Sequence, residues 1–488
     1  MIACIPDNIH INNKNFTSLI NYCNANDIKL DYNNENNDLF SAYGIYDKND
    51  ERIKKYVCEF LDISKDNIFL YKTENINLFQ VCRAELLSYV ITKYSQDKYI
   101  WNEEELQDII FNNYHDELCC CLAASKFWIE FWLLKLTQNK YDFAFIFSGS
   151  LIYSRTLLEI LKTKLNIKVF VCETYLTGHE FYFEEKYNYI ANNSLIKSSS
   201  FYNSIPYSTD ATQKLSALNK YLMKNNLNVK QPLTSDKSNI LVDNVVLIIG
   251  QVVNDFSILE HNNVGFYTIG VYKELITQII TNTNYNVIFK AHPWERKKNN
   301  LKNNFTYSKL SNEFKTTKRV QFVEDFNIYD LFDISKHVIV LNSQGGIEAV
   351  ENGIKPITLA QPFYYNKGFT IDFDISRINQ TIDYLNTHDN SYLSYDEFKQ
   401  FEIFLSKVHL NHLFTKFPSG EKKLREILKK PTEVKLYSRK SSLLPENFYT
   451  VFNNSNTQKC KIESNTDHNT VVNRIKKIAN KFFKKEEV

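Results

Sequence analysis

Short apolar runs alternate with helical patterns along most of this chain, and the clearest series lies within residues 141–174. The runs YDFAFIFSGS and KVFVCET have the pattern of buried strands, and SRTLLEILKTKL between them has helical spacing. A strand, a helix and a second strand in this order form a βαβ unit, which indicates a parallel sheet. The first 70 residues also alternate apolar runs with helical stretches, and residues 78–136 have a helical pattern without Gly or Pro.

A second series of strand-like runs begins beyond residue 238. It consists of NVVLIIG, NVIFKAH, RVQFVE, HVIVLNS and KPITLA, which alternate with helical patterns at 272–281, 328–334 and 346–352. This alternation predicts a second doubly wound α/β domain. The interval 194–237 is polar and rich in Ser, Asn, Thr and Lys, so we place an interdomain boundary near Asp236.

The two series predict three parts. An N-terminal Rossmann-like domain takes residues 1–238 and includes a helical insertion at about 76–140, a C-terminal Rossmann-like domain takes residues 239–382, and C-terminal helices at 383–488 pack back across the cleft. The length of 488 residues agrees with this division, because one hydrophobic core rarely serves so long a chain.

Composition narrows the class of protein. With 43% hydrophobic residues, 11 Gly and 9 Pro, the chain has ample material for packed cores and little for disordered linkers. A formal net charge of +2 gives no global attraction to nucleic acid, so we expect no nucleic-acid partner. The start MIACIPDNIH lacks the features of a signal peptide and no run of 18 apolar residues occurs, which predicts a cytoplasmic protein. The 9 Cys lack paired metal spacing and are expected to be reduced core thiols.

The segment VIVLNSQGGIEAVENG carries the clearest chemical signal. A buried strand ends at Leu341, a polar turn follows at 342–346, and a helix begins with Glu348 in its first turn. Backbone N–H groups at such a helix start can bind a phosphate, although an ordinary capped connection has the same pattern. In KAHPWERK the strand NVIFK runs into Lys290 and His292, whose side chains would donate to a phosphate in the same crevice. A histidine at a strand end is, however, more often structural.

Two carboxylates follow apolar strands in different halves of the chain. In LIIGQVVNDFSILE a strand closes at Gly250 and a loop presents Gln251 and Asp255, whereas in VFVCETYLTGHE a strand ends at Glu173. Carboxylates that face each other across a cleft are used in glycosyl chemistry, one as nucleophile and the other as acid or base. Each carboxylate taken alone fits a solvated loop position or a helix cap equally well.

Together the segments CETY, GQVVND, KAHPWE and NSQGGIEAVENGIKPITLAQPFYYNKGFT resemble the bacterial capsule polysaccharide biosynthesis family, which includes the retaining β-Kdo transferases of capsule and lipopolysaccharide assembly. The resemblance covers about residues 143–370. It implies an α/β fold of the GT-B-like kind, with two Rossmann-type domains that face a cleft, helical insertions and a C-terminal helical segment.

The resemblance also implies roles for residues at matching positions. Asp255 stands where the family has its nucleophile, and Glu173 stands where a glutamate faces it and would act as the base. The residues expected to hold CMP-Kdo are Gln251, Lys290, His292, Asn342, Ser343, Gln344, Gly345 and Glu348. Two of these depart from the family pattern, since Lys290 replaces a common Arg and Gln344 replaces a common Thr. These departures leave a different donor open.

The expected reaction moves Kdo from CMP-β-Kdo to a lipid-linked saccharide or glycolipid acceptor of capsule or lipopolysaccharide, with retention. His, Lys and backbone groups would neutralise the donor phosphate, so no metal or other cofactor is expected. Two alternatives stay open: transfer of another CMP-sugar or nucleotide-activated group, and a non-catalytic sugar-nucleotide-binding component of the capsule complex. The pair Asp255 and Glu173 distinguishes the second alternative, because a binding protein does not need both carboxylates at one anomeric carbon.

Two weaker signals remain. The triplet Asp372-Phe373-Asp374 spells the metal-binding Asp-x-Asp of another glycosyltransferase architecture, but it follows the polar turn rather than a strand of the first domain, and we interpret it as chance. The tail RIKKIANKFFKK at 474–485 is basic and amphipathic. It fits either peripheral association with the cytoplasmic face of the inner membrane or a solvated terminal helix.

Overall fold

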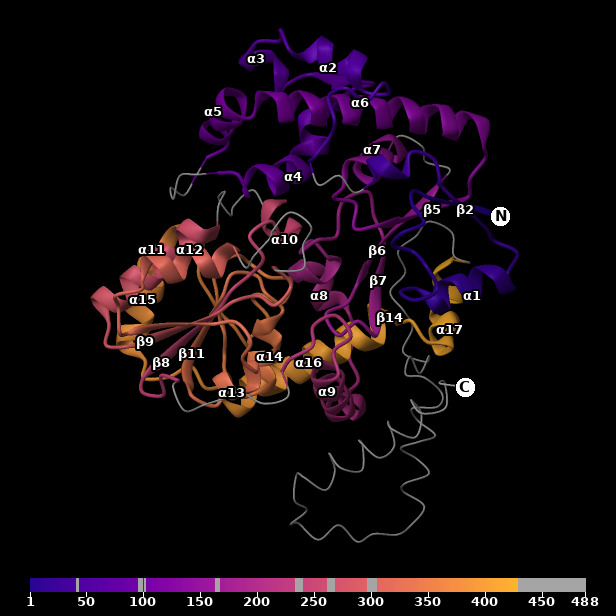
Figure 1. Ribbon diagram of the computed structural model, residues 1–488. Helices are drawn as coiled ribbons and strands as arrows, with labels where there is room; N and C mark the ends of the chain where they lie inside the picture. Colours follow the sequence, from indigo (N-terminus) through magenta and orange to yellow (C-terminus); the bar gives the residue numbers. More distant parts are fainter. Residues whose placement is uncertain are drawn as a thin grey trace, which may run out of the picture. The chain divides into compact units, whose positions relative to one another are not determined.

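Two six-stranded sheets dominate the part of the chain that the structure describes (Figure 1). In this computed structural model the described residues are 1–40, 44–94, 100, 102–162, 167–232, 240–260, 268–295 and 305–428. All of them fall within one compact unit, Met1–Tyr437. The proposed boundary near Asp236 and the basic tail at 474–485 lie outside the described residues.

The first sheet is built mainly from residues 2–185, with one strand from near residue 414. Its strands are β1 (Ile2–Ile5), β2 (Lys29–Tyr32), β5 (Phe143–Phe147), β6 (Lys168–Thr174), β7 (Glu180–Glu185) and β14 (Leu413–Thr415), in the order β14-β7-β6-β5-β1-β2. The four strands from β2 to β6 are parallel, whereas β7 and β14 are antiparallel to their neighbours. Helix α7 (Ile152–Leu161) connects β5 to β6, which confirms the predicted βαβ unit.

The second sheet is entirely parallel. Its strands are β8 (Val245–Ile249), β9 (Asn286–Lys290), β10 (Val320–Val323), β11 (Ser335–Val340), β12 (Ile357–Thr358) and β13 (Ile371–Asp372), in the order β10-β9-β8-β11-β12-β13. The helices between these strands are α10 (Phe256–Leu259), α11 (Thr268–Asn282), α12 (Phe305–Glu313), α13 (Ile328–Phe332) and α14 (Gly345–Glu351), and α15 (Ile378–Thr387) follows β13. This strand order is the Rossmann order, and it confirms the predicted second doubly wound sheet.

A helical insertion separates β2 from β5. It contains α2 (Lys54–Phe60), α3 (Lys65–Ile68), the hairpin β3 (Lys72–Thr73) and β4 (Ile76–Asn77), α4 (Leu78–Val90), α5 (Glu103–Asn113) and α6 (His115–Gln138). In Figure 1 these helices gather on one side of α7. The helical region therefore begins before the predicted residue 76. Within it, Trp132 Nε1 donates to the carbonyl oxygen of Tyr153 on α7 at 2.8 Å, so the insertion is tied to the first sheet.

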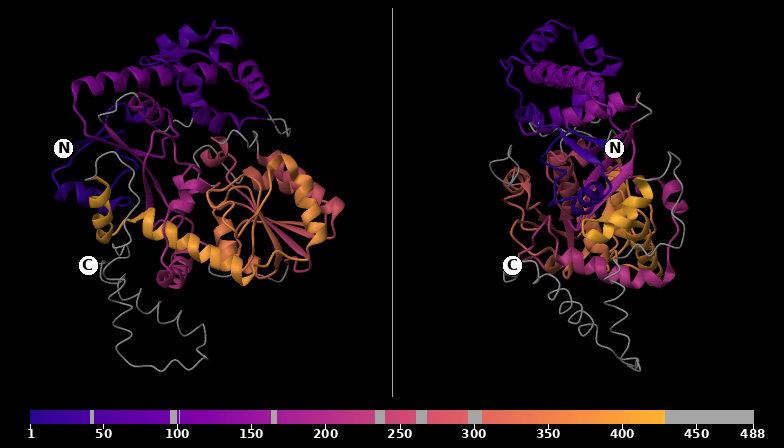
Figure 2. Two further views of the ribbon diagram at one scale, coloured as in Figure 1. Left: turned by 180° about the vertical axis from the view of Figure 1, so that it is seen from behind. Right: turned by 90° about the vertical axis from the view of Figure 1, so that its right-hand side faces the viewer.

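The chain returns to the first sheet near its described end. Figure 2 shows α16 (Tyr395–Asn411) passing from beside the second sheet to the first, where it packs on α9 (Thr209–Lys224). Strand β14 then pairs with β7, and α17 (Glu421–Leu428) packs against α1 (Thr17–Ala25). The predicted polar crossing contains α9 and the short α8 (Ser199–Ser204), and the exact domain boundaries stay a prediction.

Candidate active site

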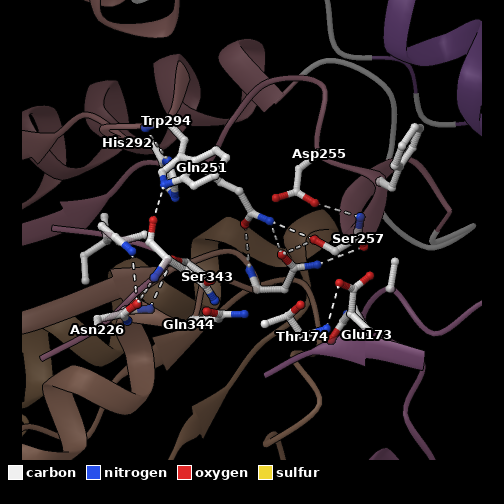
Figure 3. Close-up of a pocket in the computed structure, with 18 of the residues that line it drawn as sticks. Glu173, Thr174, Asn226, Gln251, Asp255, Ser257, His292, Trp294, Ser343 and Gln344 are labelled. Carbon is white, nitrogen blue, oxygen red and sulfur yellow. Dashed lines mark hydrogen bonds between the residues drawn. The ribbon is translucent and has the colours of Figure 1, made fainter. Parts of the chain in front are cut away.

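A single pocket of about 600 Å³ collects residues from the carboxyl ends of strands in both sheets. That volume lies in the range of small-molecule sites. The predicted residues that line it are Glu173, Gln251, Asp255, Lys290, His292, Asn342, Ser343, Gln344, Gly345 and Glu348. Every candidate site residue from the sequence is therefore brought to one place, and Figure 3 shows the carboxylates and the polar side chains between them.

The two carboxylates reach the pocket from different sheets. Asp255 is the N-cap residue of α10, where its Oδ1 accepts a hydrogen bond from the Ser257 N–H at 2.9 Å. Glu173 is near the end of β6, and its Oε1 accepts from the Thr174 N–H at 3.0 Å. Figure 3 shows Asp255 on the α10 side and Glu173 on the β6 side of the same pocket.

Burial raises the pKa of Glu173 to about 7, and the negative charge of Asp255 adds to this rise. Hydrogen bonds from the Thr174 N–H and the Ser148 hydroxyl, together with the nearby His10, act in the opposite direction. Ser148 has a left-handed backbone with φ of 57°, followed by Gly149 with φ of 77°. The Ser148 hydroxyl on this turn is thus near enough to Glu173 to lower the pKa of its carboxyl group.

Gln251 and Asn342 are hydrogen-bonded to each other and to Ser257. Gln251 Nε2 donates to Asn342 Oδ1 at 2.5 Å and to Ser257 Oγ at 2.9 Å, and Asn342 Nδ2 donates to the Ser257 carbonyl oxygen at 3.0 Å. The exposed fraction is 4% for Gln251 and 7% for Asn342. Through this network, the loop that bears Asp255 is attached to the turn that follows β11. Whether either residue contacts a donor stays a prediction.

His292 is held in one tautomer by its own loop. Its Nδ1 accepts a hydrogen bond from the Trp294 N–H at 3.1 Å, and Trp294 Nε1 donates to the Asn228 carbonyl oxygen at 2.7 Å. Because Nδ1 is the acceptor, the hydrogen of the neutral ring lies on Nε2. His292 lines the pocket at this loop.

Lys290 is more deeply buried than a ligand-facing lysine needs to be. Its Nζ donates to the carbonyl oxygens of Glu324 at 2.6 Å and Ala291 at 3.2 Å, which uses two of its three N–H groups. Burial lowers the pKa of Lys290 to about 8 and raises the pKa of the nearby Glu348 to about 7. Direct donation from Lys290 to a phosphate depends on its third N–H group.

The turn after β11 is held from behind by an aromatic residue. Tyr364 donates its hydroxyl hydrogen to the Ser343 carbonyl oxygen at 2.5 Å, and a Cβ at Gly346 would lie 2.1 Å from that hydroxyl oxygen. Glycine is thus required at 346 for the close approach. Ser343 Oγ accepts from the Gly345 N–H at 3.2 Å, which leaves its own O–H to donate into the pocket. Gln344 is exposed at the same edge.

Several lining residues were not predicted. They include His10, Phe147, Ser148, Asn192, Ser194, Asn226, Asn228, Gln231 and Trp294. His10 follows β1 closely, so the strand-end rule that found the other residues applies to it and to Asp7 as well. Residues 226–231 belong to the polar interval that predicted a domain crossing. Nothing in that interval distinguishes a pocket wall from a linker.

The weak metal motif has a structural role. Asp372 accepts hydrogen bonds from the hydroxyls of Thr358 at 2.7 Å and Thr370 at 2.8 Å, and Asp374 caps the 3₁₀ turn Ile375–Arg377. Within the described ranges no three His, Cys, Asp or Glu side chains are grouped as metal ligands would be. None of the described helices has the length and apolar character needed to cross a bilayer.

Comparison with known sequences supports the resemblance to a family. Residues 181–414 match the profile of the family described as capsule polysaccharide biosynthesis protein. This region of the chain is similar to that family. The match confirms the resemblance over slightly less than half of the chain. Asp255 and all the expected donor-binding residues lie within the matched region, whereas Glu173 precedes it. A comparison with curated proteins gave no match.

Solved structures show distant similarity only. The beta Kdo 2,4 transferase of Thermosulfurimonas dismutans KpsC is 16% identical over 54% of this chain and 78% of its own, with a TM-score of 0.39. The beta Kdo 2,7 transferase of the same KpsC is 15% identical over 61% of this chain and 89% of its own, with a TM-score of 0.36. A UDP-GlcNAc 2-epimerase from Methanocaldococcus jannaschii is 14% identical over 88% of this chain and 99% of its own, with a TM-score of 0.31.

Proposed function

We propose that this protein is a glycosyltransferase of capsule polysaccharide biosynthesis that moves Kdo from CMP-β-Kdo to a saccharide acceptor with retention. One observation carries the proposal: a carboxylate from each sheet lines a single pocket together with all the residues expected to hold a nucleotide sugar. The family match over residues 181–414 supports the capsule assignment.

The donor binds mainly against the second sheet. His292 Nε2, the Ser343 hydroxyl and the polar turn that follows donate to the phosphate, and Lys290 contributes positive charge from behind. These fixed donors stabilise negative charge on the leaving phosphate without waiting for water to reorganise. We therefore expect no metal requirement.

Asp255 is the nucleophile in the first step. One carboxylate oxygen, Oδ1, is held by the Ser257 N–H, which orients the group without protonating it. An oxygen of Asp255 attacks the anomeric carbon, the bond from that carbon to the phosphate oxygen breaks, and CMP leaves with the electron pair. The product is a glycosyl ester on Asp255 with inverted configuration.

Glu173 acts in the second step. It removes the proton from the acceptor hydroxyl while the oxygen attacks the anomeric carbon from the opposite face, and Asp255 leaves as a carboxylate. The two inversions give net retention. A pKa raised to about 7 by burial suits this role, because the group can both accept and release a proton near neutral pH.

The acceptor is a lipid-linked saccharide or a glycolipid, which the enzyme meets at the cytoplasmic face of the inner membrane. A different CMP-sugar donor would use the same phosphate contacts, and the exposed Gln344 and buried Lys290 are the positions where the donor preference would differ. A non-catalytic sugar-nucleotide-binding protein is disfavoured because Asp255 and Glu173 line the same pocket.

The decisive experiment traps the glycosyl-enzyme. The variant Glu173→Gln is incubated with CMP-Kdo and examined by intact-protein mass spectrometry, followed by peptide mapping. We expect a mass increase of one Kdo residue that maps to Asp255. The matched control is Glu185→Gln, which changes a strand-end glutamate on β7 that does not line the pocket and should behave like wild type. An adduct on another residue, or full transfer activity in Asp255→Ala, contradicts the assignment.

A further inference from the structure

A histidine and an aspartate that the proposed mechanism does not use lie just after β1. Asp7 is 1% exposed, and its Oδ1 accepts hydrogen bonds from the N–H groups of Ile9 and His10, both at 2.9 Å. The same oxygen is 3.1 Å from His10 Nδ1. Because a carboxylate only accepts hydrogen bonds, Nδ1 carries the ring hydrogen and Nε2 is the basic nitrogen.

Two aromatic residues fix this pair. The His10 ring stacks on Phe147, with 4.5 Å between ring centroids and an interplanar angle of 4°. The Tyr153 hydroxyl donates to the second oxygen of Asp7 at 2.8 Å. These contacts fix the position and rotation of the imidazole ring and determine which of its nitrogens carries the hydrogen. Such an arrangement of a buried carboxylate behind a histidine is the one that general bases use.

His10 is close enough to Glu173 to lower the pKa of that carboxyl group through its charge. Both line the cavity, together with Phe147 and Ser148 at the end of β5. The His10 side chain is 21% exposed, so it borders both the pocket and solvent. The ionisable groups that act on this pair are Asp7 and Tyr153 behind the ring, and Asp255 across the pocket from Glu173.

We propose that His10, oriented by Asp7, is a second proton-transfer residue on the acceptor side of the pocket and receives the proton that Glu173 removes from the acceptor. This inference rests on the proposed function. It adds to that function the route by which the proton leaves the site. His10 has the proton-transfer role and Asp7 the positioning role.

The step balances without another reactant. The acceptor oxygen forms a bond to the anomeric carbon, the ester bond to Asp255 breaks, and its electron pair returns to the Asp255 carboxylate. The hydroxyl proton passes to Glu173 and then to Nε2 of His10, which becomes imidazolium and releases the proton to solvent. Glu173 is thereby returned to its charged form for the next turnover.

The test separates the two chemical steps. Wild type, His10→Ala, His10→Gln and Asp7→Asn are mixed with CMP-Kdo in a rapid-quench instrument, and adduct formation and transfer to a saccharide acceptor are timed separately between pH 6 and 8.5. The matched control is His388→Ala, which removes an exposed histidine outside the pocket. Circular dichroism checks that each variant is folded, and His10→Gln retains a side-chain N–H for Asp7.

We expect both His10 variants to form the adduct at the wild-type rate and to transfer the sugar about 10²-fold more slowly at pH 7. Added imidazole should restore transfer in His10→Ala, and Asp7→Asn should show a smaller loss. Wild-type transfer by both His10 variants overturns the inference, as does equal slowing of both steps without rescue by imidazole. If wild type gives neither adduct nor transfer, the proposed function itself fails and the role of His10 falls with it.

Discussion

The two sides of the pocket differ in chemistry although both are made from strand ends. The side formed by the first sheet presents ionisable groups, chiefly Glu173 and the pair of His10 and Asp7. The side formed by the second sheet presents hydrogen-bonding side chains such as His292 and Ser343, along with the ionisable groups of Asp255, Lys290 and Glu348. In the proposed mechanism the first sheet serves proton transfer and the acceptor, and the second sheet serves phosphate binding and the donor.

Asp255 belongs to the second series of strands but is anchored by the first half of the chain. Helix α10, which it caps, is followed by Glu260, and the carboxylate of Glu260 forms a buried ion pair with Arg155 on α7. Arg83 on α4 donates to the Leu259 carbonyl oxygen at 2.6 Å. The proposed nucleophile is therefore fixed relative to both sides, as a reaction between two separately bound substrates requires.

The largest expected effect comes from removing the nucleophile. Asp255→Asn should reduce transfer by at least about 10³-fold and leave CMP affinity unchanged, because the amide keeps the cap but does not attack the anomeric carbon. Asp374→Asn is the matched control, since Asp374 caps a turn through a contact of 2.9 Å to the Ser376 N–H, the same length as that from Asp255 to the Ser257 N–H. Equal losses of transfer activity in both variants would show that Asp255 serves only as the N-cap of α10.

The next largest effect concerns the ion pair of Arg155 with Glu260, which links α7 to the residue that follows α10. Arg155→Ala should lower the free energy of unfolding by about 3 kcal/mol, because it leaves Glu260 as a buried carboxylate without its partner. Arg52→Ala removes more exposed ion pairs to Asp38 and Asp50 and should cost about 1 kcal/mol or less. Chemical denaturation of both variants measures the difference. Similar losses in the free energy of unfolding would show that the buried ion pair of Arg155 with Glu260 contributes no more stability than an exposed one.

A smaller effect is expected from pH, and it tests the acceptor side alone. The ionised form of Glu173 is the base, so the rate of the second step should rise with pH and level off above its pKa of about 7. One pH unit below that value the rate should be about tenfold lower. Ser148→Ala removes a hydrogen bond that lowers this pKa and should move the profile to higher pH. A profile without a step between pH 6 and 8 would exclude Glu173 as the base.

The smallest effect tests the donor side. His292→Ala should weaken CMP binding about tenfold, which corresponds to the loss of one hydrogen bond to a charged group. Isothermal titration calorimetry with CMP measures it, and His388→Ala again serves as the control. Adduct decay in the presence of acceptor should be unchanged, because CMP has already left. Unchanged affinity would remove His292 from the donor site.

Sequence reasoning recovered most of the sheets because buried strands require uninterrupted apolar runs, which are visible locally. FAFIF, VFVC and VVLII each became a strand at the expected place. The candidate site followed from one further rule, that ligands bind at the carboxyl ends of parallel strands. Applied to β1, the same rule leads to Asp7 and His10. They were not predicted because the run IACI is followed by an unremarkable loop.

By itself, then, the sequence determined the two strand series, the parallel character of their cores and the residues at their ends, since each depends on local patterns of apolar and polar side chains. The tertiary structure alone decided what those residues contact. The bonds of Gln251 to Asn342 and of Lys290 to two carbonyl oxygens, and the raised pKa of Glu173, depend on groups distant in the chain and on burial between them. Hydrogen-bond partners and local dielectric are properties of packing, which no local pattern encodes.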